Sequence, residues 1–588
     1  MVEDKLETMG KYKIFNKKIS GPFTIPAGLV TTEVSILEKI ANEIPEIGIL
    51  TTKSIGPEPR EGNREPIIAQ YSPFSFINAV GLTNPGVEEF RKRISKIKIP
   101  PDKFLLTSIF GSNEKEFKEV AEKLVELTDG FELNISCPHS DKYGQAVGQD
   151  NAIVEKITKS IVSLGKPVFV KISPNLDVKE TVKAAIRGGV SGITAINTKG
   201  PELYKYRVEG GWRPVLSNKV GGVSGKAILE LGLTSVNKIR ELTDLPIIAC
   251  GGISTKAEVE RYKEAGANFF GIGSALSGMN TEEIKQYFHD LLINLEEGTN
   301  NAASLLKEKL NMDYQKYTVR ENRSLADDLF LLSLDYNPPK DGAFRFAKAP
   351  RVPAALQGIK PGQFIFAWLP EKGEKPFSVL DDAPLTLLIQ KRGCFTNELS
   401  KLKENDFIYI RGPYGDLPKL NGLHPPTTLP AKSGGPILLV GGGTGIAALY
   451  LFAKKNKKII ALLGAKDKNH LPYLEKFKVL CEELYLTTEN GEIGRRGRVT
   501  DILSEIIKKI KPAGCLNCGP EAMVKMATDI ESQYLNPEKI YSSIELLTRC
   551  GIGLCGSCAT SKGYRSCVDG TFLKNNQLFH QSQLPERQ

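Results

Sequence analysis

The sequence lacks the long apolar runs of membrane proteins and secreted precursors. Its first residues, MVEDKLETMGKYKIF, are too polar for a signal peptide. Residues 436–453 carry no charge and approach the length of a membrane span, but four glycines interrupt them (Gly441, Gly442, Gly443 and Gly445). A strand, a turn and a helix account better for this segment. We therefore expect a cytoplasmic protein without membrane association.

Basic segments with interleaved aromatic side chains, which are typical of single-strand nucleic-acid binders, are also missing. The net charge of +10 comes from lysines spread through 588 residues. A positive net charge suits the binding of acidic small molecules as well as it suits the binding of nucleic acid. We therefore expect no nucleic-acid partner. The chain is too long for one core, and a length of this order predicts roughly three or four domains.

Cysteines are few, but four of the ten lie between Cys550 and Cys567. In a reducing compartment such clustering indicates metal binding rather than disulfides. The C-x4-C-x2-C…C spacing is typical of a plant-type [2Fe–2S] cluster, with Cys550, Cys555, Cys558 and Cys567 as ligands. A structural zinc site is the alternative, although zinc sites more often use paired CxxC arms. We interpret the CxxC of Cys515 and Cys518 as incidental.

What is present in the first half is a repeated strand and helix pattern. Short apolar runs alternate with helical patterns and predict eight strands: Phe23–Leu29, Ile47–Lys53, Phe104–Ile109, Phe131–Ser136, Val168–Ile172, Gly192–Asn197, Pro246–Cys250 and Phe269–Gly273. Eight such units predict a (β/α)8 barrel, whose active site lies at the carboxyl ends of the strands.

Polar residues and glycines gather at these predicted strand ends. Cys137 follows the fourth strand directly and is a candidate base, since surroundings that favour thiolate lower the pKa of a thiol; a buried structural cysteine is the alternative. The glycine pairs after strands seven and eight predict a phosphate site. Lys171 could then lie near the ring of a bound FMN. Lys53, also at a strand end, is a second candidate, with an ordinary surface lysine as the alternative.

Several separated motifs within residues 18–295 resemble the class 1 dihydroorotate dehydrogenases: NISCP at 134–138, NAVGL at 78–82, INT at 196–198, GGVSG at 221–225 and Lys53. The resemblance implies that Cys137 removes a proton from C5 of dihydroorotate while a hydride passes from C6 to FMN. It implies a barrel homodimer and a substrate site of Lys53, Asn78, Gly81, Leu82, Asn134, Asn197 and Thr198. The implied FMN site comprises Ala27, Gly28, Lys53, Ser54, Asn134, Lys171, Ile196, Gly225, Gly251, Gly252, Gly273 and Ser274.

The chain departs from that family at several positions. His139 stands where many members have asparagine. A histidine at this position is also similar to dihydropyrimidine dehydrogenases. Lys226 occupies a loop position usually held by proline, and Ala27 and Ser108 stand where serine and asparagine are frequent. These differences leave the exact pyrimidine open between dihydroorotate and uracil or thymine derivatives.

The second half begins after a polar stretch at 296–304 and changes to antiparallel-looking strands at Tyr317–Asn322, Gly362–Trp368, Leu385–Gln390 and Phe407–Arg411. A small β-barrel is expected here. Its KPFS and GCFT segments resemble the FAD-binding signature of ferredoxin reductase-like modules. The resemblance implies FAD contacts by Lys375, Pro376, Phe377, Ser378, Phe395 and Thr396.

A strand, a glycine turn and an apolar helix follow at 436–453, a geometry that brings a pyrophosphate close to backbone N–H groups. Together with TENG at 488–491 and CGPEAM at 518–523 this resembles the nicotinamide-binding half of the same reductases. The implied NAD contacts are Gly441, Gly442, Gly443, Thr444, Gly445, Cys518, Gly519 and Pro520. The sequence does not distinguish NAD from NADP.

Residues 312–588 as a whole resemble the electron-transfer subunit of dihydroorotate dehydrogenase B. We therefore expect a fusion of a barrel (1–300), an FAD-binding β-barrel (312–425), an NAD-binding α/β domain (430–535) and a [2Fe–2S] domain (540–588). Dihydroorotate would be oxidised at FMN, and electrons would pass through the cluster and FAD to NAD+. The alternatives are a dihydropyrimidine dehydrogenase-like enzyme and a general ferredoxin–NAD reductase.

Overall fold

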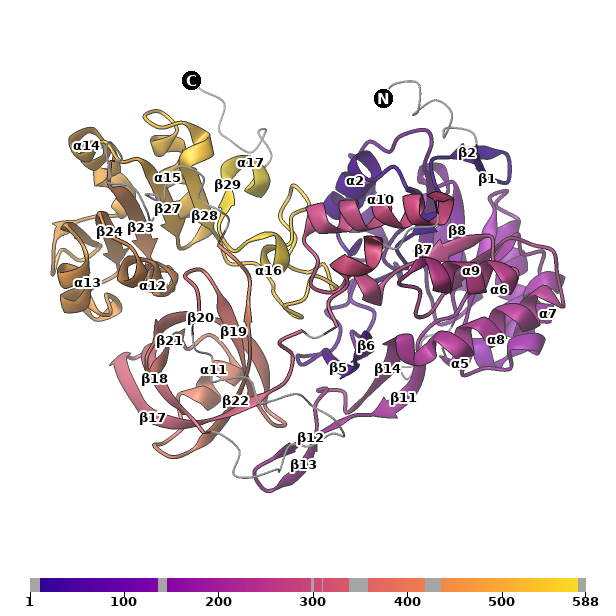
Figure 1. Cartoon of the computed structure of the whole chain (residues 1–588), viewed down its shortest axis with the longest axis horizontal. Helices are drawn as coiled ribbons and strands as arrows, with labels where there is room; N and C mark the ends of the chain where they lie inside the picture. Colours follow the sequence, from indigo (N-terminus) through magenta and orange to yellow (C-terminus); the bar gives the residue numbers. More distant parts are fainter. Residues whose placement is uncertain are drawn as a thin grey trace. The chain divides into compact units, whose positions relative to one another are not determined.

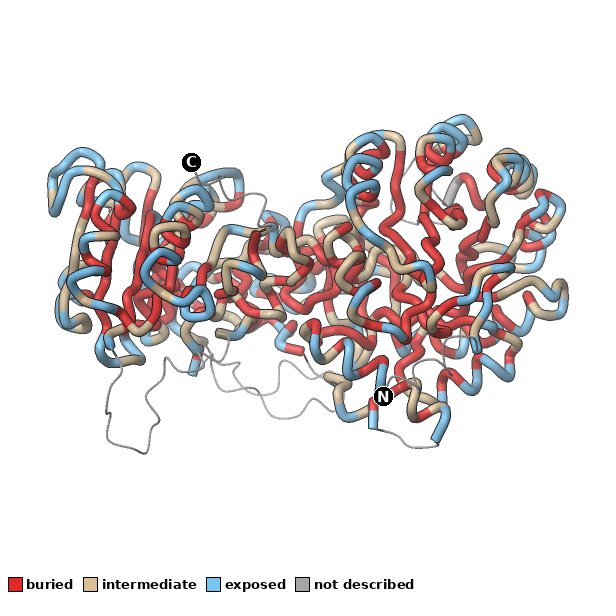
Figure 2. Tube along the Cα trace, turned by 90° about the horizontal axis from the view of Figure 1, so that it is seen from above, coloured by how far each residue is buried: buried red, intermediate tan, exposed pale blue. Residues whose placement is uncertain are grey.

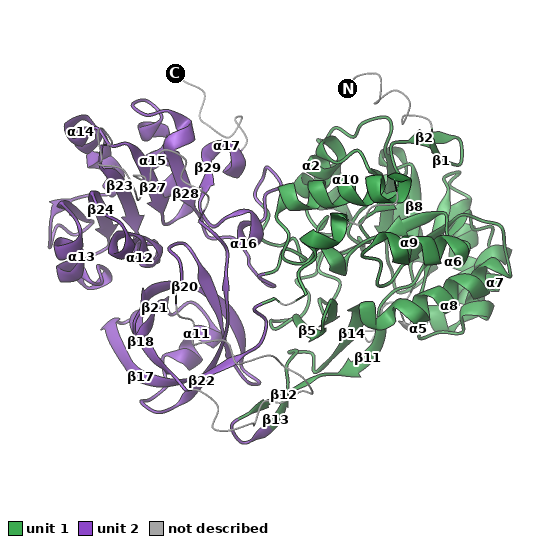
Figure 3. Cartoon of the chain, viewed as in Figure 1, with its two compact units in different colours: residues 1–208, 212–310, 552–559 green, residues 209–211, 311–551, 560–588 purple. Residues whose placement is uncertain are grey.

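The computed structural model describes residues 11–135, 145–297, 301–308, 310–337, 358–417 and 435–579. The chain divides into two compact units (Figure 3). Unit 1 comprises residues 1–208, 212–310 and 552–559, and unit 2 comprises residues 209–211, 311–551 and 560–588. The four predicted domain boundaries stay predictions.

Unit 1 is built around a closed barrel of eight parallel strands (Figure 1). In barrel order these are β10 (Gly192–Ala195), β15 (Ile247–Cys250), β16 (Phe269–Gly271), β3 (Phe23–Thr24), β4 (Ile47–Thr51), β7 (Phe104–Ile109), β8 (Gly130–Asn134) and β9 (Val168–Ile172). Each of the eight predicted strands is present, several of them shorter at the carboxyl end. The predicted (β/α)8 barrel is confirmed.

Every residue of β4, β7, β8 and β9 is buried, because side chains fill the interior of such a barrel and helices cover its outside. Figure 2 shows buried segments in red inside the molecule and exposed segments in pale blue at its surface. The helices are α2 (Val34–Glu43), α3 (Val87–Ile94), α4 (Glu114–Leu124), α5 (Gln145–Gln149), α6 (Asn151–Val162), α7 (Val178–Arg187), α8 (Leu229–Arg240), α9 (Lys256–Glu264) and α10 (Thr281–Glu297). Several begin at a side-chain cap. Asp150 Oδ1, for example, accepts from the backbone N–H of Ala152 at 2.9 Å.

Unit 1 also contains small sheets that the sequence did not predict. The largest has the order β11 (Lys199–Leu203), β14 (Val220–Gly225), β6 (Ser75–Asn78), β5 (Ile68–Ser72). In it, Asn78 pairs with Gly222 across an antiparallel ladder, so this sheet brings the NAVGL and GGVSG motifs together. Two two-stranded sheets are also described, β1 (Tyr12–Ile14) with β2 (Lys17–Ile19) and β12 (Lys205–Val208) with β13 (Gly211–Pro214). Residues 209–211, between and at the start of the last two strands, belong to unit 2.

Unit 2 begins with a closed antiparallel barrel of six strands, in the order β17 (Gln315–Ala326), β18 (Leu329–Tyr336), β21 (Leu385–Gln390), β20 (Gly373–Asp382), β19 (Phe364–Leu369), β22 (Phe407–Tyr414). The four predicted strands overlap with β17, β19, β21 and β22, whereas β18 and β20 were not predicted. The short helix α11 (Cys394–Leu399) follows β21. The predicted β-barrel is confirmed.

The rest of unit 2 is a seven-stranded sheet in the order β26 (Arg495–Arg496), β25 (Glu483–Thr488), β24 (Ile459–Ala465), β23 (Ile437–Gly442), β27 (Gly514–Cys518), β28 (Ile540–Ser543), β29 (Leu573–Lys574). It is parallel except for the pair of β28 and β29. Helices α12 (Ile446–Lys455), α13 (Leu474–Leu480), α14 (Val499–Ile510) and α15 (Glu521–Glu531) connect its strands. Strand β23 and helix α12 confirm the predicted strand, turn and helix, and no described helix is long and apolar enough to cross a membrane.

Candidate functional site

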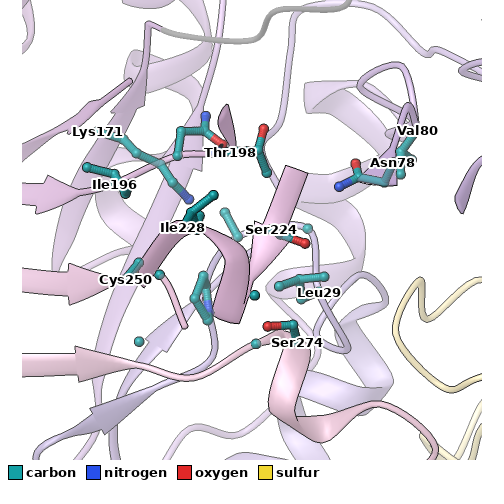
Figure 4. A pocket seen from close by; sticks show the side chains of 18 of the residues that line it. Leu29, Asn78, Val80, Lys171, Ile196, Thr198, Ser224, Ile228, Cys250 and Ser274 are labelled. Atoms are coloured by element: carbon teal, nitrogen blue, oxygen red, sulfur yellow. Dashed lines mark hydrogen bonds between the residues drawn. The ribbon is translucent and has the colours of Figure 1, made fainter. Parts of the chain in front are cut away.

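One cavity in unit 1 gathers the polar residues from the carboxyl ends of the barrel strands. It encloses about 1060 Å³, part of it open to solvent. All the described residues of the predicted substrate and FMN sites line it: Ala27, Gly28, Lys53, Ser54, Asn78, Gly81, Leu82, Asn134, Lys171, Ile196, Asn197, Thr198, Gly225, Gly251, Gly252, Gly273 and Ser274. Figure 4 shows Lys171 and Asn78 reaching into the cavity from opposite sides in that view.

Two predicted candidates fall outside the described residues. Cys137, the candidate base, and His139, the unusual neighbour, belong to residues 136–144. Strand β8 ends at Asn134, so the chain leaves the barrel for this segment directly from a cavity-lining position. The proton-transfer role of Cys137 stays a prediction.

The glycines after β15 form a cradle that suits a phosphate group. Gly251 and Gly252 have φ values of +125° and +76°, and a Cβ at Gly252 would lie 2.9 Å from Cβ of Leu229. At Gly273 a Cβ would lie 2.3 Å from Cδ1 of Leu29. Without side chains, successive backbone N–H groups can approach an anion closely. These positions therefore fit the phosphate of an FMN.

The two predicted lysines are buried at strand ends that line the same cavity. Lys53 is 7% exposed, and its Nζ lies 3.4 Å from the position that a Cβ would take at Gly28, whose φ of +85° favours glycine. Lys171 lies 3.8 Å from the carboxylate of Glu132. Both ammonium groups can support an anionic ligand or an electron-rich ring. The surface-lysine alternative for Lys53 is wrong.

A chain of polar side chains inside the barrel connects to the cavity. Asn134 Nδ2 donates to Ser54 Oγ at 3.0 Å, Ser54 Oγ lies 2.9 Å from Ser108 Oγ, and Ser108 Oγ donates to Glu132 Oε1 at 3.0 Å. Glu132 is 1% exposed. Glu132 was not predicted as a site residue, because a glutamate in an alternating strand normally indicates the solvent side. Only the barrel closure shows that this face is interior.

Two further amide candidates of the cavity are held by backbone contacts. Asn78 Nδ2 donates to the carbonyl oxygen of Gly222 at 3.3 Å, and Asn197 Oδ1 accepts from the N–H of Thr198 at 2.8 Å. Asn175, which the sequence analysis did not single out, donates to the carbonyl of Thr198 at 3.3 Å and accepts from the N–H of Gly200 at 3.0 Å. It braces the loop that carries Asn197.

Cys250 is a further cavity-lining residue that the sequence analysis assigned no role. Burial raises the pKa of its thiol to about 12, although the nearby Lys171 acts in the opposite direction. The thiol therefore stays protonated at neutral pH. It packs as a small apolar group and cannot act as a base there.

In unit 2 the two halves of the FAD signature meet. Lys375, Pro376, Phe377 and Ser378 lie on β20, and Phe395 and Thr396 lie on α11. The rings of Phe377 and Phe395 stack with centroids 6.5 Å apart and an interplanar angle of 24°. Thr396 Oγ1 accepts from the N–H of Arg392 at 2.9 Å and from that of Gly393 at 3.2 Å. The two motifs therefore form one surface, as a shared ligand requires.

The two halves of the nicotinamide signature also lie side by side in unit 2. Strand β23 ends at Gly442, residues 443–445 form a 3-10 turn, and α12 starts at Ile446. Gly441 pairs with Cys518 on β27, and a Cβ at Gly445 would lie 2.4 Å from the carbonyl oxygen of Cys518. Gly519 and Pro520 follow directly, and the backbone N–H groups at the start of α12 suit a pyrophosphate.

The four cysteines of the predicted cluster are all buried. Cys555 and Cys558 belong to unit 1, whereas Cys550 and Cys567 belong to unit 2. Within the described part of the chain, no group of three or more His, Cys, Asp or Glu side chains is arranged to hold a metal ion. The [2Fe–2S] cluster therefore stays a prediction from the cysteine spacing.

Comparison with known proteins places unit 1 in a family. Residues 9–292 match the family model "Dihydroorotate dehydrogenase". The "Dihydroorotate dehydrogenase B (NAD(+)), catalytic subunit" of Pyrococcus horikoshii is 36% identical over 305 residues, which are 51% of this chain and 98% of that protein. The protein of the same description from Methanocaldococcus jannaschii is 36% identical over 296 residues, which are 50% of this chain and 95% of that one.

A relative whose description names fumarate matches a shorter stretch. The "Dihydroorotate dehydrogenase A (fumarate)" of Lactobacillus helveticus is 36% identical over 240 residues, 40% of this chain and 76% of that protein. These relatives cover about half of the chain, and the cavity described above lies within the matched residues. The chain is an enzyme that belongs to the dihydroorotate dehydrogenase family.

Proposed function

We propose that this protein oxidises (S)-dihydroorotate to orotate, in pyrimidine biosynthesis, and delivers the electrons to NAD+. The observation that supports this best is the cavity at the barrel end, which combines the glycine cradle, two buried lysines and the amides of Asn78, Asn134 and Asn197. A planar pyrimidine presents both carbonyl oxygens and ring N–H groups, and asparagine can pair with either.

Within this cavity the residues have separate tasks. Lys171 and the glycines Gly251, Gly252 and Gly273 would hold FMN, which supplies a two-electron acceptor when it is bound. The three asparagines and Thr198 would orient the pyrimidine, and Lys53 would neutralise its carboxylate. Cys137, reached from the end of β8, would take the proton from C5. Orientation of this kind is a large part of catalysis, because it replaces a bimolecular encounter.

Unit 2 would carry the electrons onward. Its FAD signature on β20 and α11 and its nicotinamide signature at the ends of β23 and β27 support FAD and NAD as ligands. The proposal includes a [2Fe–2S] cluster because the spacing of four cysteines is typical of one: Cys550, Cys555, Cys558 and Cys567. A homodimer through unit 1 and a cytoplasmic location complete it.

The test is anaerobic reduction of the purified protein by dihydroorotate, with dihydrouracil in a parallel sample. Bleaching of the flavin absorbance and formation of NADH with dihydroorotate alone is the expected result. Bleaching with dihydrouracil instead would overturn the substrate assignment and direct attention to His139. A Cys137→Ser variant that keeps its flavins should lose dihydroorotate oxidation, and full activity of that variant would contradict the role of Cys137 as base.

A further inference from the structure

Glu132 is a carboxylate enclosed by the barrel of unit 1. It lies on β8 two residues before the cavity-lining Asn134, and alternate residues of a strand share one face. We infer that Glu132 is a positioning residue: through Ser108 and Ser54 it fixes the amide of Asn134, so that the amide oxygen accepts a hydrogen bond from a ring N–H of the bound pyrimidine. This inference rests on the proposed function.

The carboxylate of Glu132 determines which atom donates in each hydrogen bond of the series Glu132, Ser108, Ser54 and Asn134. An ionised carboxylate only accepts, and a serine hydroxyl has a single proton to donate. Ser108 donates its proton to Glu132 Oε1, at 3.0 Å. Ser54 must then donate to Ser108 across the 2.9 Å contact. Ser54 Oγ, with its own proton used, is an acceptor for Asn134 Nδ2 at 3.0 Å.

The orientation of the Asn134 amide is therefore determined far from the ligand. If the amide flipped, its oxygen would face Ser54 Oγ, which has no proton left to donate, and leaving a buried acceptor without a donor is unfavourable. With the nitrogen held at Ser54, the oxygen is directed to the other side of the side chain. Because Asn134 lines the cavity, this selects a ligand with a ring N–H at that point.

The same carboxylate also faces Lys171. Its oxygen lies 3.8 Å from Lys171 Nζ, and the two side chains are 2% and 7% exposed. Burial of one charge without its partner is strongly unfavourable, and Lys171 supplies the opposite charge to this carboxylate.

The decisive variant is Ser108→Ala, which removes the middle hydroxyl from this series of hydrogen bonds and leaves the residues that line the cavity unchanged. Its matched control is Thr107→Val, on the adjacent residue of β7. The Thr107 hydroxyl is buried and donates to Thr128 Oγ1 at 2.8 Å, so the control removes a comparable bond elsewhere. Orotate affinity is read from the change in flavin absorbance on titration, and FMN content is measured in each variant.

We expect Ser108→Ala to raise the Kd of orotate about tenfold with unchanged FMN content, and Thr107→Val to stay within about twofold of the parent protein. Glu132→Gln should raise this Kd as well. Ser54→Ala should raise the Kd of orotate to a similar extent, measured on protein whose FMN content has been determined because Ser54 also lines the cavity. The Ser54→Ala/Ser108→Ala double variant should have no higher a Kd than either single variant, because both substitutions interrupt the same series of hydrogen bonds.

Equal Kd values for Ser108→Ala and Thr107→Val, or multiplicative effects in the double variant, would overturn the inference. If Ser108→Ala does not fold, Glu132→Gln against Thr107→Val provides the comparison, since neither residue lines the cavity. A parent protein that neither binds orotate nor is bleached by dihydroorotate would contradict the proposed function and this inference together. A parent protein that does both, with unaffected variants, would contradict this inference alone.

Discussion

Arg411 and Glu374 form a bidentate ion pair in the interior of unit 2. Arg411 Nε and Nη2 donate to the two carboxylate oxygens of Glu374 at 2.6 and 2.7 Å, and the side chains are 1% and 0% exposed. Arg411 Nη1 also donates to the carbonyl oxygen of Cys550 at 2.9 Å, and Tyr314 donates to Glu374 at 2.6 Å. The pair thus ties β20 and β22 to the first cysteine of the predicted cluster.

Breaking this pair should destabilise unit 2. Glu374→Gln leaves a buried guanidinium without its counter-charge, and we expect a loss of about 3–5 kcal/mol in the free energy of unfolding. Replacing both partners, in Glu374→Leu with Arg411→Met, should recover much of that loss. Thermal unfolding measured by calorimetry checks this, with the exposed pair of Arg392 and Glu545 as control. Arg392→Gln should change stability by less than about 1 kcal/mol, and equal effects at both pairs would contradict the prediction.

Glu531 should make the stability of unit 2 depend on pH. Burial raises the pKa of this carboxyl from 4.5 to about 8, against the opposing effect of Asn517. Between these values the unfolded chain has lost the proton that the folded chain keeps, so stability should fall as the pH rises from about 4.5 to about 8. Glu531→Gln should flatten this part of the profile and raise Tm at pH 8.

Denaturant unfolding of both proteins at several pH values between 5 and about 9 measures this effect. The exposed Glu521, which pairs with Lys525 on the same helix, provides the control. Glu521→Gln should leave the shape of the profile unchanged. A parent protein whose stability is constant over this window would show that Glu531 is not protonated in the folded state.

Gly445→Ala should separate the two half-reactions. A Cβ there would lie 2.4 Å from the carbonyl oxygen of Cys518, so the start of α12 must move away from β27. Displacements of this kind can reduce activity by about 100-fold. We expect NADH formation to fall to that extent. Flavin bleaching by dihydroorotate should persist, because the substitution lies outside the parallel barrel of unit 1. Stopped-flow absorbance follows both steps, and loss of bleaching would contradict the assignment of this glycine to NAD.

The cysteine prediction can be tested by chemical analysis. We expect about two iron and two acid-labile sulfide per chain, and loss of both in Cys558→Ser. Cys394, an exposed cysteine of α11, provides the control, and Cys394→Ser should keep the full content. Zinc in place of iron would favour the alternative metal. Absence of any metal from freshly prepared protein would remove the cluster from the proposal.

The architecture of both barrels could be foreseen, because their signals are local. The eight parallel strands of unit 1 each contain a short apolar run, and the glycines and asparagines follow these runs directly in sequence. Strand β20 was missed because Gly, Lys, Glu, Pro and Asp have low strand propensity, and only pairing with β19 and β21 makes it a strand. The sheet that pairs Asn78 with Gly222 joins segments far apart in the chain, which no local pattern reveals.

By itself the sequence determined which residues stand at the ends of the barrel strands, since residue type and strand period are properties of short segments. Only the tertiary structure decided which charged side chains are interior. Glu132, Lys171, Glu374 and Arg411 have the residue types of a solvent-exposed surface, yet each is buried. Their burial is stable because closure of each barrel places an opposite charge or a hydrogen-bond donor within reach, and those partners come from strands distant in the chain.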